Sequence, residues 1–101
     1  MRIRTGTVEG TGSALSIECG FIPQRVELVN IDGDALCIWT SDMGAGKGYK
    51  ILGTGLGALL ASAGVTISAS TASFIGFTIG ADGDLNKTSE TLCWTAYPIT
   101  D

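Results

Sequence analysis

The chain contains 31 consecutive residues, from Ile51 to Ala81, without one ionisable side chain. All six basic and all ten acidic residues lie outside this stretch. Charged groups are what a small domain normally shows to water, because they are almost never fully buried without a partner. We therefore expect this part of the chain to lie in a core, or on a surface that another protein covers.

The uncharged stretch does not have the pattern of a membrane span. Glycine, serine and threonine interrupt its apolar runs at 53–55, at 62 and 64, and at 68–73. A spanning helix needs about 20 predominantly apolar residues in a row. The pattern instead predicts strands and loops of small residues packed inside an assembly, with no membrane as partner.

The length of 101 residues, with no linker or charge run to divide it, predicts a single domain over residues 1–101. The formal net charge is -4. The six basic residues are scattered along the chain: Arg2, Arg4, Arg25, Lys47, Lys50 and Lys87. Because they form no basic stripe to neutralise phosphates, we expect no nucleic-acid partner.

The N-terminus and the cysteines bear on where the protein is made. No apolar run of seven or more residues precedes Gly10, so the sequence predicts no secretory signal. Cys19, Cys37 and Cys93 are far apart and form no C-x-x-C pair. Three scattered cysteines suggest neither a disulfide framework nor a zinc site. We expect buried, reduced thiols and synthesis in a reducing cytoplasm.

The composition favours strands over helices. The chain has 15 glycines and many serines and threonines, which disfavour helix. The best helical candidate, Leu56 to Ala63, is bounded by glycines and too short to be stable alone. The expected strands are residues 2–9, 14–19, 25–31, 36–40, 49–52, 65–69, 74–79 and 91–97. About seven or eight short antiparallel strands predict an all-β domain, either a small β-sandwich or a jelly-roll or barrel-like fold.

Three local patterns predict how these strands are arranged. Residues 2–9 and 14–19, joined by Gly-Thr-Gly at 10–12, are expected to form an opening hairpin. Asp-Gly-Asp at 32–34 is a turn of the kind that joins hairpin strands. Strand 36–40 has apolar side chains on both faces, so we expect it at the centre of a sheet.

The sequence lacks the usual catalytic patterns. It has no histidine, which removes the commonest general base, the serine triad and most transition-metal sites. The glycine-rich segments 44–48 and 53–57 lack the spacing of a phosphate loop and of a dinucleotide fingerprint, respectively. We therefore expect no enzyme, no catalytic residue and no cofactor.

Two further binding patterns have a structural interpretation beside the functional one. Asp82, Asp84 and Asn86 have the alternate spacing of a calcium loop, but the glycine and glutamate that should follow are absent. We interpret them as a capped turn and expect no metal. Trp39 and Trp94 could stack on sugars; because each lies within an expected strand, we interpret them as core residues.

The segment 76–96, GFTIGADGDLNKTSETLCWTA, resembles a recurrent segment of tailed-bacteriophage virion proteins. In those proteins a strand reading G-F-x-I/L-G leads into a loop with Asn and then into a closing, aromatic-bearing strand. The opening is similar too, with Gly10-Thr-Gly-Ser, Cys19-Gly-Phe-Ile-Pro and Val26-Glu-Leu-Val-Asn30. The resemblance implies a small virion structural protein, either a capsid decoration (cement) protein or part of a tail or fibre.

Together, the resemblance and the uncharged stretch predict a decoration protein that binds the outside of a phage head and stabilises capsomer contacts. Its expected partners are the major capsid protein and copies of itself, as a dimer or trimer, in a virion assembled in the host cytoplasm. The residues expected in these contacts are Leu56, Leu59, Leu60, Val65 and Ile67. The alternatives are a tail, spike or fibre component with loop 41–47 as its exposed tip, and a small carbohydrate-binding β-sandwich using Trp39 or Trp94.

Overall fold

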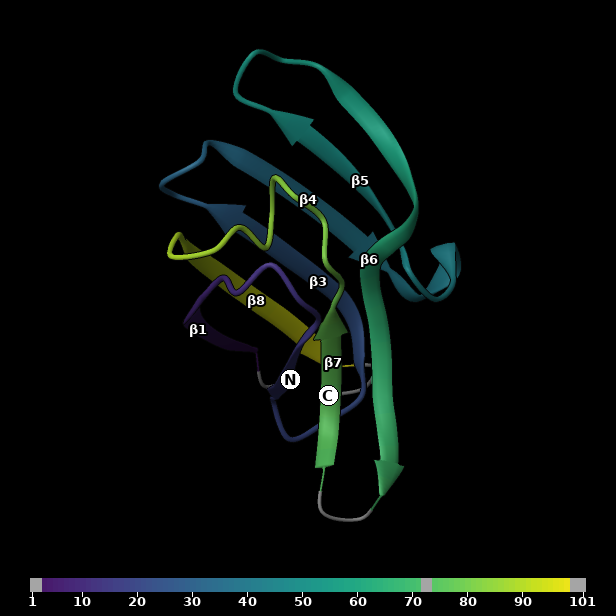
Figure 1. Ribbon diagram of the computed structural model, residues 1–101. Helices are drawn as coiled ribbons and strands as arrows, with labels where there is room; N and C mark the ends of the chain where they lie inside the picture. Colours follow the sequence, from purple (N-terminus) through teal and green to yellow (C-terminus); the bar gives the residue numbers. More distant parts are fainter. Residues whose placement is uncertain (1–2, 72–73, 99–101) are drawn as a thin grey trace.

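The computed structural model describes residues 3–71 and 74–98, which form eight strands and one short 3₁₀ helix (Figure 1). The elements in chain order are β1 (Arg4–Glu9), β2 (Leu15–Glu18), β3 (Pro23–Asn30), β4 (Ala35–Thr40), η1 (Ser41–Met43), β5 (Lys47–Leu52), β6 (Gly57–Thr71), β7 (Phe74–Ile79) and β8 (Thr91–Pro98). Arg2, the first residue of the first expected strand, lies outside the described residues.

All eight strands belong to one antiparallel sheet with the order β1-β8-β3-β4-β5-β6-β7-β2. The all-β prediction is confirmed. The sheet is curled into a half-barrel, so the two-sheet sandwich is replaced by the barrel-like alternative. Strand β4 lies in the middle of the sheet, as its apolar faces predicted.

The two edge strands explain why the sheet curls. Strand β1 pairs with β8 and strand β2 pairs with β7, at opposite ends of the sheet order. Only residues 10–14 join them, and an extended link of that length spans on the order of 20 Å. The guanidinium of Arg4 also donates a hydrogen bond of 3.2 Å to the carbonyl oxygen of Cys19, just after β2. The two edges therefore lie near each other without forming a ladder.

The predicted opening hairpin is wrong, because β1 and β2 are not paired with each other. Gly10 does not form a hairpin turn between them but packs against the loop before β8. A Cβ atom at Gly10 would lie 2.2 Å from the carbonyl oxygen of Lys87. The Gly10 amide also donates a hydrogen bond to the carbonyl oxygen of Glu90 at 2.8 Å. The glycine therefore allows a close contact with a segment far away in the sequence and does not form a local turn.

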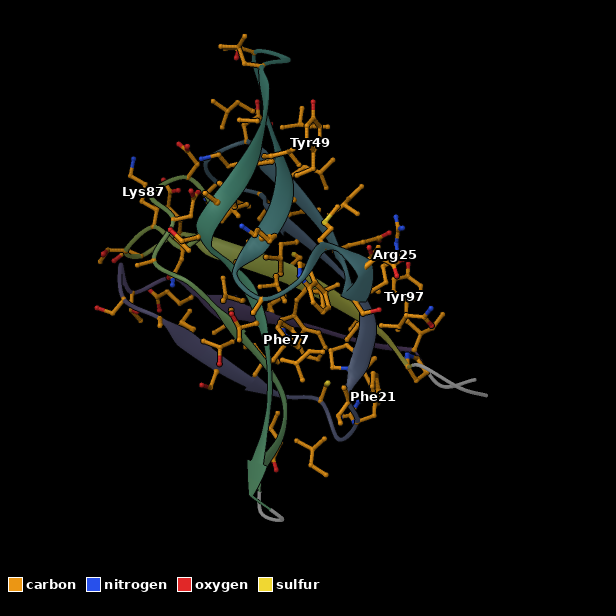
Figure 2. All side chains as sticks on the ribbon, turned by 90° about the vertical axis from the view of Figure 1, so that its right-hand side faces the viewer. Phe21, Arg25, Tyr49, Phe77, Lys87 and Tyr97 are labelled. Carbon is orange, nitrogen blue, oxygen red and sulfur yellow. The ribbon has the colours of Figure 1, made fainter. Side chains whose placement is uncertain are left out.

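The core lies on the inner face of the curled sheet. Its buried side chains are Ile17, Cys19, Val26, Leu28, Ala35, Cys37, Trp39, Val65, Phe77, Ile79, Leu85, Leu92, Trp94 and Ala96. Phe77 lies in the middle of the molecule in Figure 2 and meets Trp94 edge to face, with ring centroids 5.7 Å apart. The indole N–H of Trp39 donates to the carbonyl oxygen of Gly44 at 2.8 Å. Both tryptophans are core residues, as interpreted from the sequence.

Strand β6 is the longest element and has two parts. Residues 57–60 pair with β5, whereas pairing with β7 begins at Val65. The register shifts between these parts, and Ala63 adopts a positive φ of 66° there. Figure 1 shows the upper part of β6 running with β5 and the lower part running down with β7. The former helical candidate is therefore mostly strand, since ladders with neighbouring strands outweigh its weak helical propensity.

The loop 80–90 covers one end of the core and is fixed by two buried asparagines. The Asn86 amide group donates to the carbonyl oxygens of Ser13 and Gly80, and its oxygen accepts from the Thr11 amide. Asn30 donates to the carbonyl oxygen of Asp84 in the same loop. Because buried polar groups are costly unless they are hydrogen-bonded, these contacts determine where the loop lies.

Candidate functional site

The outer face of the sheet, opposite the core, carries an uncharged apolar patch over β3 to β6. Its residues are neighbours across adjacent strands and alternate with core residues along their strands. They are Val29, Leu36, Ile38, Tyr49, Ile51 and Leu59, which we call the outer apolar face. Large contiguous apolar patches, of more than about a few hundred Å², are uncommon on monomers and mark interaction sites.

Within the outer apolar face the β6 residue Leu59 is the most exposed. Leu59 is 74% exposed, while Tyr49 and Val29 are each 40% exposed. Tyr49 projects near the end of the molecule formed by β5 and β6 (Figure 2). Where this face meets the β3–β4 turn and the end of β5 there is an open hollow of about 440 Å³, lined in part by Val29, Leu36 and Ile51. The face therefore offers both a projecting side and a recess to a partner.

Charged side chains at one border of the outer apolar face neutralise one another. Glu27, the neighbour of Ile38 across β3 and β4, pairs with Arg25 at 2.9 Å. The Tyr97 hydroxyl donates to Glu27 at 3.2 Å, and the Arg25 guanidinium lies over the Tyr97 ring, as Figure 2 shows. This border therefore presents a balanced polar rim rather than a field of one sign.

The structure separates the five residues predicted to make contacts. Leu59 belongs to the outer apolar face, and Leu56 is 69% exposed in the β5–β6 turn. Leu60 is half-buried, and Ile67 is 36% exposed on the lower part of β6. Val65 is fully buried in the subunit's own core, so the prediction that it contacts a partner is wrong: it has no surface left for one.

The sequence interpretation missed most of the outer apolar face. Its members in β3, β4 and β5 lie outside the uncharged stretch or at its start. The available signal was the alternation in β4, where Leu36 and Ile38 are as apolar as Cys37 and Trp39. That pattern was interpreted only as a central strand, but it also means that one apolar side faces away from the core.

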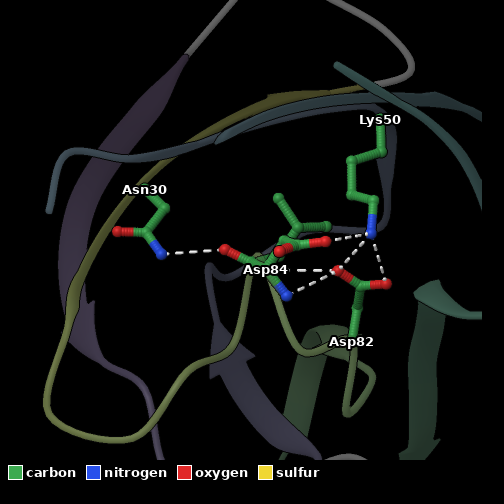
Figure 3. A network of polar contacts seen from close by, with 5 residues as sticks. Asn30, Lys50, Asp82 and Asp84 are labelled. Atoms are coloured by element: carbon green, nitrogen blue, oxygen red, sulfur yellow. Dashed lines mark hydrogen bonds and ion pairs between the residues drawn. The ribbon is translucent and has the colours of Figure 1, made fainter. Parts of the chain in front are cut away.

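On the other side of the sheet, Lys50 is bound by the loop 80–90 (Figure 3). Its ammonium group lies 3.0 and 3.1 Å from the two carboxylate oxygens of Asp82 and 2.7 Å from Asp84. Burial alone lowers the pKa of Lys50, but the hydrogen bonds and charges of Asp84 and Asp82 outweigh it and raise that pKa. The contacts connect the loop to β5.

This cluster also explains the calcium-like spacing. Asp82 accepts hydrogen bonds from the backbone amides of Asp84 and Leu85, as expected of a side chain that caps a turn. The Lys50 ammonium supplies the positive charge beside both carboxylates, and Asn86 points to other partners. Over residues 3–71 and 74–98, no group of three or more His, Cys, Asp and Glu side chains could hold a metal ion.

The three cysteines are free thiols, and Cys19 and Cys37 are buried. Burial raises the pKa of Cys37 from 9.0 to about 11, with a further increase from the charge of Asp82 and an opposing effect of Lys50. The thiol is therefore held neutral, which makes it a core side chain rather than a nucleophile.

The Cys37 pKa predicts a loss of stability at alkaline pH. The pKa of Cys37 is higher in the folded chain than in the unfolded chain, so the neutral buried thiol contributes to the free energy of unfolding. That contribution is fully present below pH 9 and declines as the pH rises toward 11. A difference of that size corresponds to about 3 kcal/mol. Urea unfolding at pH 8, 9.5 and 11 should show this decline. A Cys37→Ala variant should be less stable at pH 8 and decline less steeply; parallel curves for the two proteins would contradict the assignment.

In the part of the chain that the structure describes, no helix has the length and apolar character needed to cross a membrane. Comparison with protein-family models, with curated proteins and with solved structures finds no match to this chain. The candidate function therefore rests on the chain's own surface, above all on the outer apolar face.

Proposed function

We propose that this chain is a structural protein of a tailed-bacteriophage virion, and specifically a decoration protein on the outside of the head. In that role it self-associates and contacts the major capsid protein at capsomer junctions, without catalysing a reaction. The observation that carries the proposal is the outer apolar face, an uncharged surface left open by a subunit whose core is already complete.

The chemistry of the subunit suits such a role. A decoration protein needs a rigid scaffold, an apolar surface for its neighbours and a charged remainder for solubility. The eight-stranded sheet supplies the scaffold and the outer apolar face supplies the contact. The net charge of -4 is distributed over other segments.

The gross stabilisation from such a contact grows with the apolar area that it buries. Apolar burial contributes roughly 25 cal/mol per Å², and a standard interface buries about 1,600 Å² over both partners. Only the surplus over ordering and lost motion appears as affinity. Because Leu59 is largely exposed, replacing it should change the stability of the free subunit little. Its substitution therefore tests mainly the contacts with partners.

We predict that Leu59→Asp weakens both self-association and binding to heads that lack the protein by at least tenfold, because it places a charge in an apolar contact. Leu60→Asp should mainly lower the stability of the subunit and weaken assembly through that loss, since Leu60 is half-buried and packs against the core. Co-sedimentation with heads and the sedimentation coefficient of the free protein measure the two effects.

The matched control is Thr54→Asp, which adds the same charge in the exposed β5–β6 turn, outside the outer apolar face. It should bind and assemble as the unaltered chain does. Unchanged binding and assembly by Leu59→Asp would argue against the proposal.

Of the two alternatives, the tail, spike or fibre component stays open, whereas the structure argues against the carbohydrate-binding one. A tail, spike or fibre component would use the same apolar face, with the loop 41–47 exposed as a tip; electron microscopy distinguishes it by density on tails instead of heads. The carbohydrate-binding alternative loses its basis, because Trp39 and Trp94 are only 1% and 8% exposed and have no ring face free for a sugar.

A further inference from the structure

The upper part of β6 has an open edge. Residues 57–60 pair with β5 on one side, whereas the ladder with β7 on the other side begins only at Val65. Beyond Leu60 the strand is irregular: Ala63 has a positive φ, and the Lys47 ammonium donates to the carbonyl oxygen of Ala61 at 3.2 Å. We call residues 57–60 the β6 edge.

The backbone groups at this edge point away from the sheet. The amide of Leu52 donates to the carbonyl oxygen of Leu56 at 2.9 Å, so these residues form a hydrogen-bonded pair. Such pairs alternate with non-bonded ones along an antiparallel ladder. The opposed residues Tyr49 and Leu59 are therefore a non-bonded pair. The N–H and C=O groups of Gly57 and Leu59 consequently face the open side.

Nothing in the local sequence protects this edge. Natural edge strands avoid pairing with other chains through charges, prolines, bulges or a covering segment. The β6 edge and the turn before it contain neither a charge nor a proline, and Leu59 is 74% exposed. An uncharged edge is also compatible with a copy of itself, because no like charges meet across the contact.

We propose that the β6 edge binds the same edge of a second copy of this chain, with the two strands antiparallel around a two-fold axis at Ala58. In this register Gly57 faces Leu59 of the second copy, and each such pair exchanges both backbone hydrogen bonds. The two Ala58 residues form the close, non-bonded pair on the axis, with Cα atoms about 4.5 Å apart. Small methyl groups fit that spacing.

The pairing would join the two outer apolar faces. A two-fold axis perpendicular to the plane of the sheet keeps equivalent faces on one side of the combined sheet. Leu59 and Tyr49 of each subunit, which are cross-strand neighbours, then lie beside the axis and the two patches become one. The dimer is a property of the free protein, so its failure is distinguishable from failure of the proposed role on a phage head.

A disulfide across the axis tests the register. Ala58 is exposed, and its expected separation from its symmetry mate lies within the Cα range that disulfides span. The full chain carrying Ala58→Cys should form a covalent dimer under mild oxidation, seen on a non-reducing gel and by mass. Thr54→Cys, exposed but away from the axis, and the unaltered chain are the controls. Dimer formation by Ala58→Cys no faster than in these controls would overturn the proposal.

A second pair of variants separates the backbone from the side chain. Leu59→Pro removes an N–H that faces the open side, which an edge position tolerates, whereas Leu59→Ala keeps that N–H and removes most of the side chain. The unaltered chain and Leu59→Ala should sediment as dimers, and Leu59→Pro, folded by circular dichroism, as a monomer. A monomeric unaltered chain, a dimeric Leu59→Pro, or equal dissociation of both variants would contradict edge pairing.

Discussion

Replacing Gly64 by alanine is expected to destabilise the subunit by about 3 kcal/mol. The added Cβ would lie 1.9 Å from the carbonyl oxygen of Lys47, a backbone atom that cannot move aside alone. Gly64 also donates to the carbonyl oxygen of Gly46 and accepts from the amide of Gly80. The start of β5, the bend of β6 and the end of β7 thus meet at one residue.

Urea unfolding of Gly64→Ala measures this effect, and Gly83→Ala is the matched control. A Cβ at Gly83 would have nothing within 4 Å, so that variant should be neutral or more stable by up to about 1 kcal/mol. Equal unfolding midpoints for the two variants would mean that the close approach at the β6 bend is absent.

Replacing Asn86 by alanine should cost about 3 kcal/mol, because the change leaves three backbone groups without their partner. These are the amide of Thr11 and the carbonyl oxygens of Ser13 and Gly80, all of which bond to the Asn86 side chain. Asn86 is fully buried, so water does not replace these bonds without a local rearrangement. The link between the two edge strands would lose its side-chain attachment to the loop 80–90 and would keep only backbone hydrogen bonds such as that from the Gly10 amide to the carbonyl oxygen of Glu90.

Thermal unfolding should show the loss as a fall in Tm on the order of 10–20 °C. Thr88→Ala in the same loop is the control, since Thr88 is exposed, and it should change the Tm by a few degrees at most. A Tm for Asn86→Ala close to that of the control would show that Asn86 does not fix the link.

The sequence predicted where most strands lie but not how they are ordered. Alternation of side chains is a local signal, and in β4 it identified both the strand and its central position. The pairing of β1 with β8 joins residues at the two ends of the chain. No local pattern encodes that choice, and the Gly-Thr-Gly at 10–12 favoured a hairpin that the long-range ladders replace.

The contact residues show a related limit. A stretch without charges is typical both of a core and of a covered surface. The uncharged stretch therefore predicted partner contacts for both Leu59 and Val65, although only Leu59 is exposed. Residues six apart in an unbroken strand share a face. The register shift between them, with Ala63 at a positive φ, changes that relation. An irregularity of this kind depends on how β5 and β7 pack against β6. The residues of β6 alone do not predict that packing.

Sedimentation equilibrium of the unaltered protein over a range of micromolar concentrations tests most directly whether its apolar surface is built to be covered by other molecules. One chain has a mass of 10.4 kDa, and we predict an assembly of at least two chains that Leu59→Asp disperses. A mass of 10.4 kDa at every concentration, the same for both proteins, would contradict it.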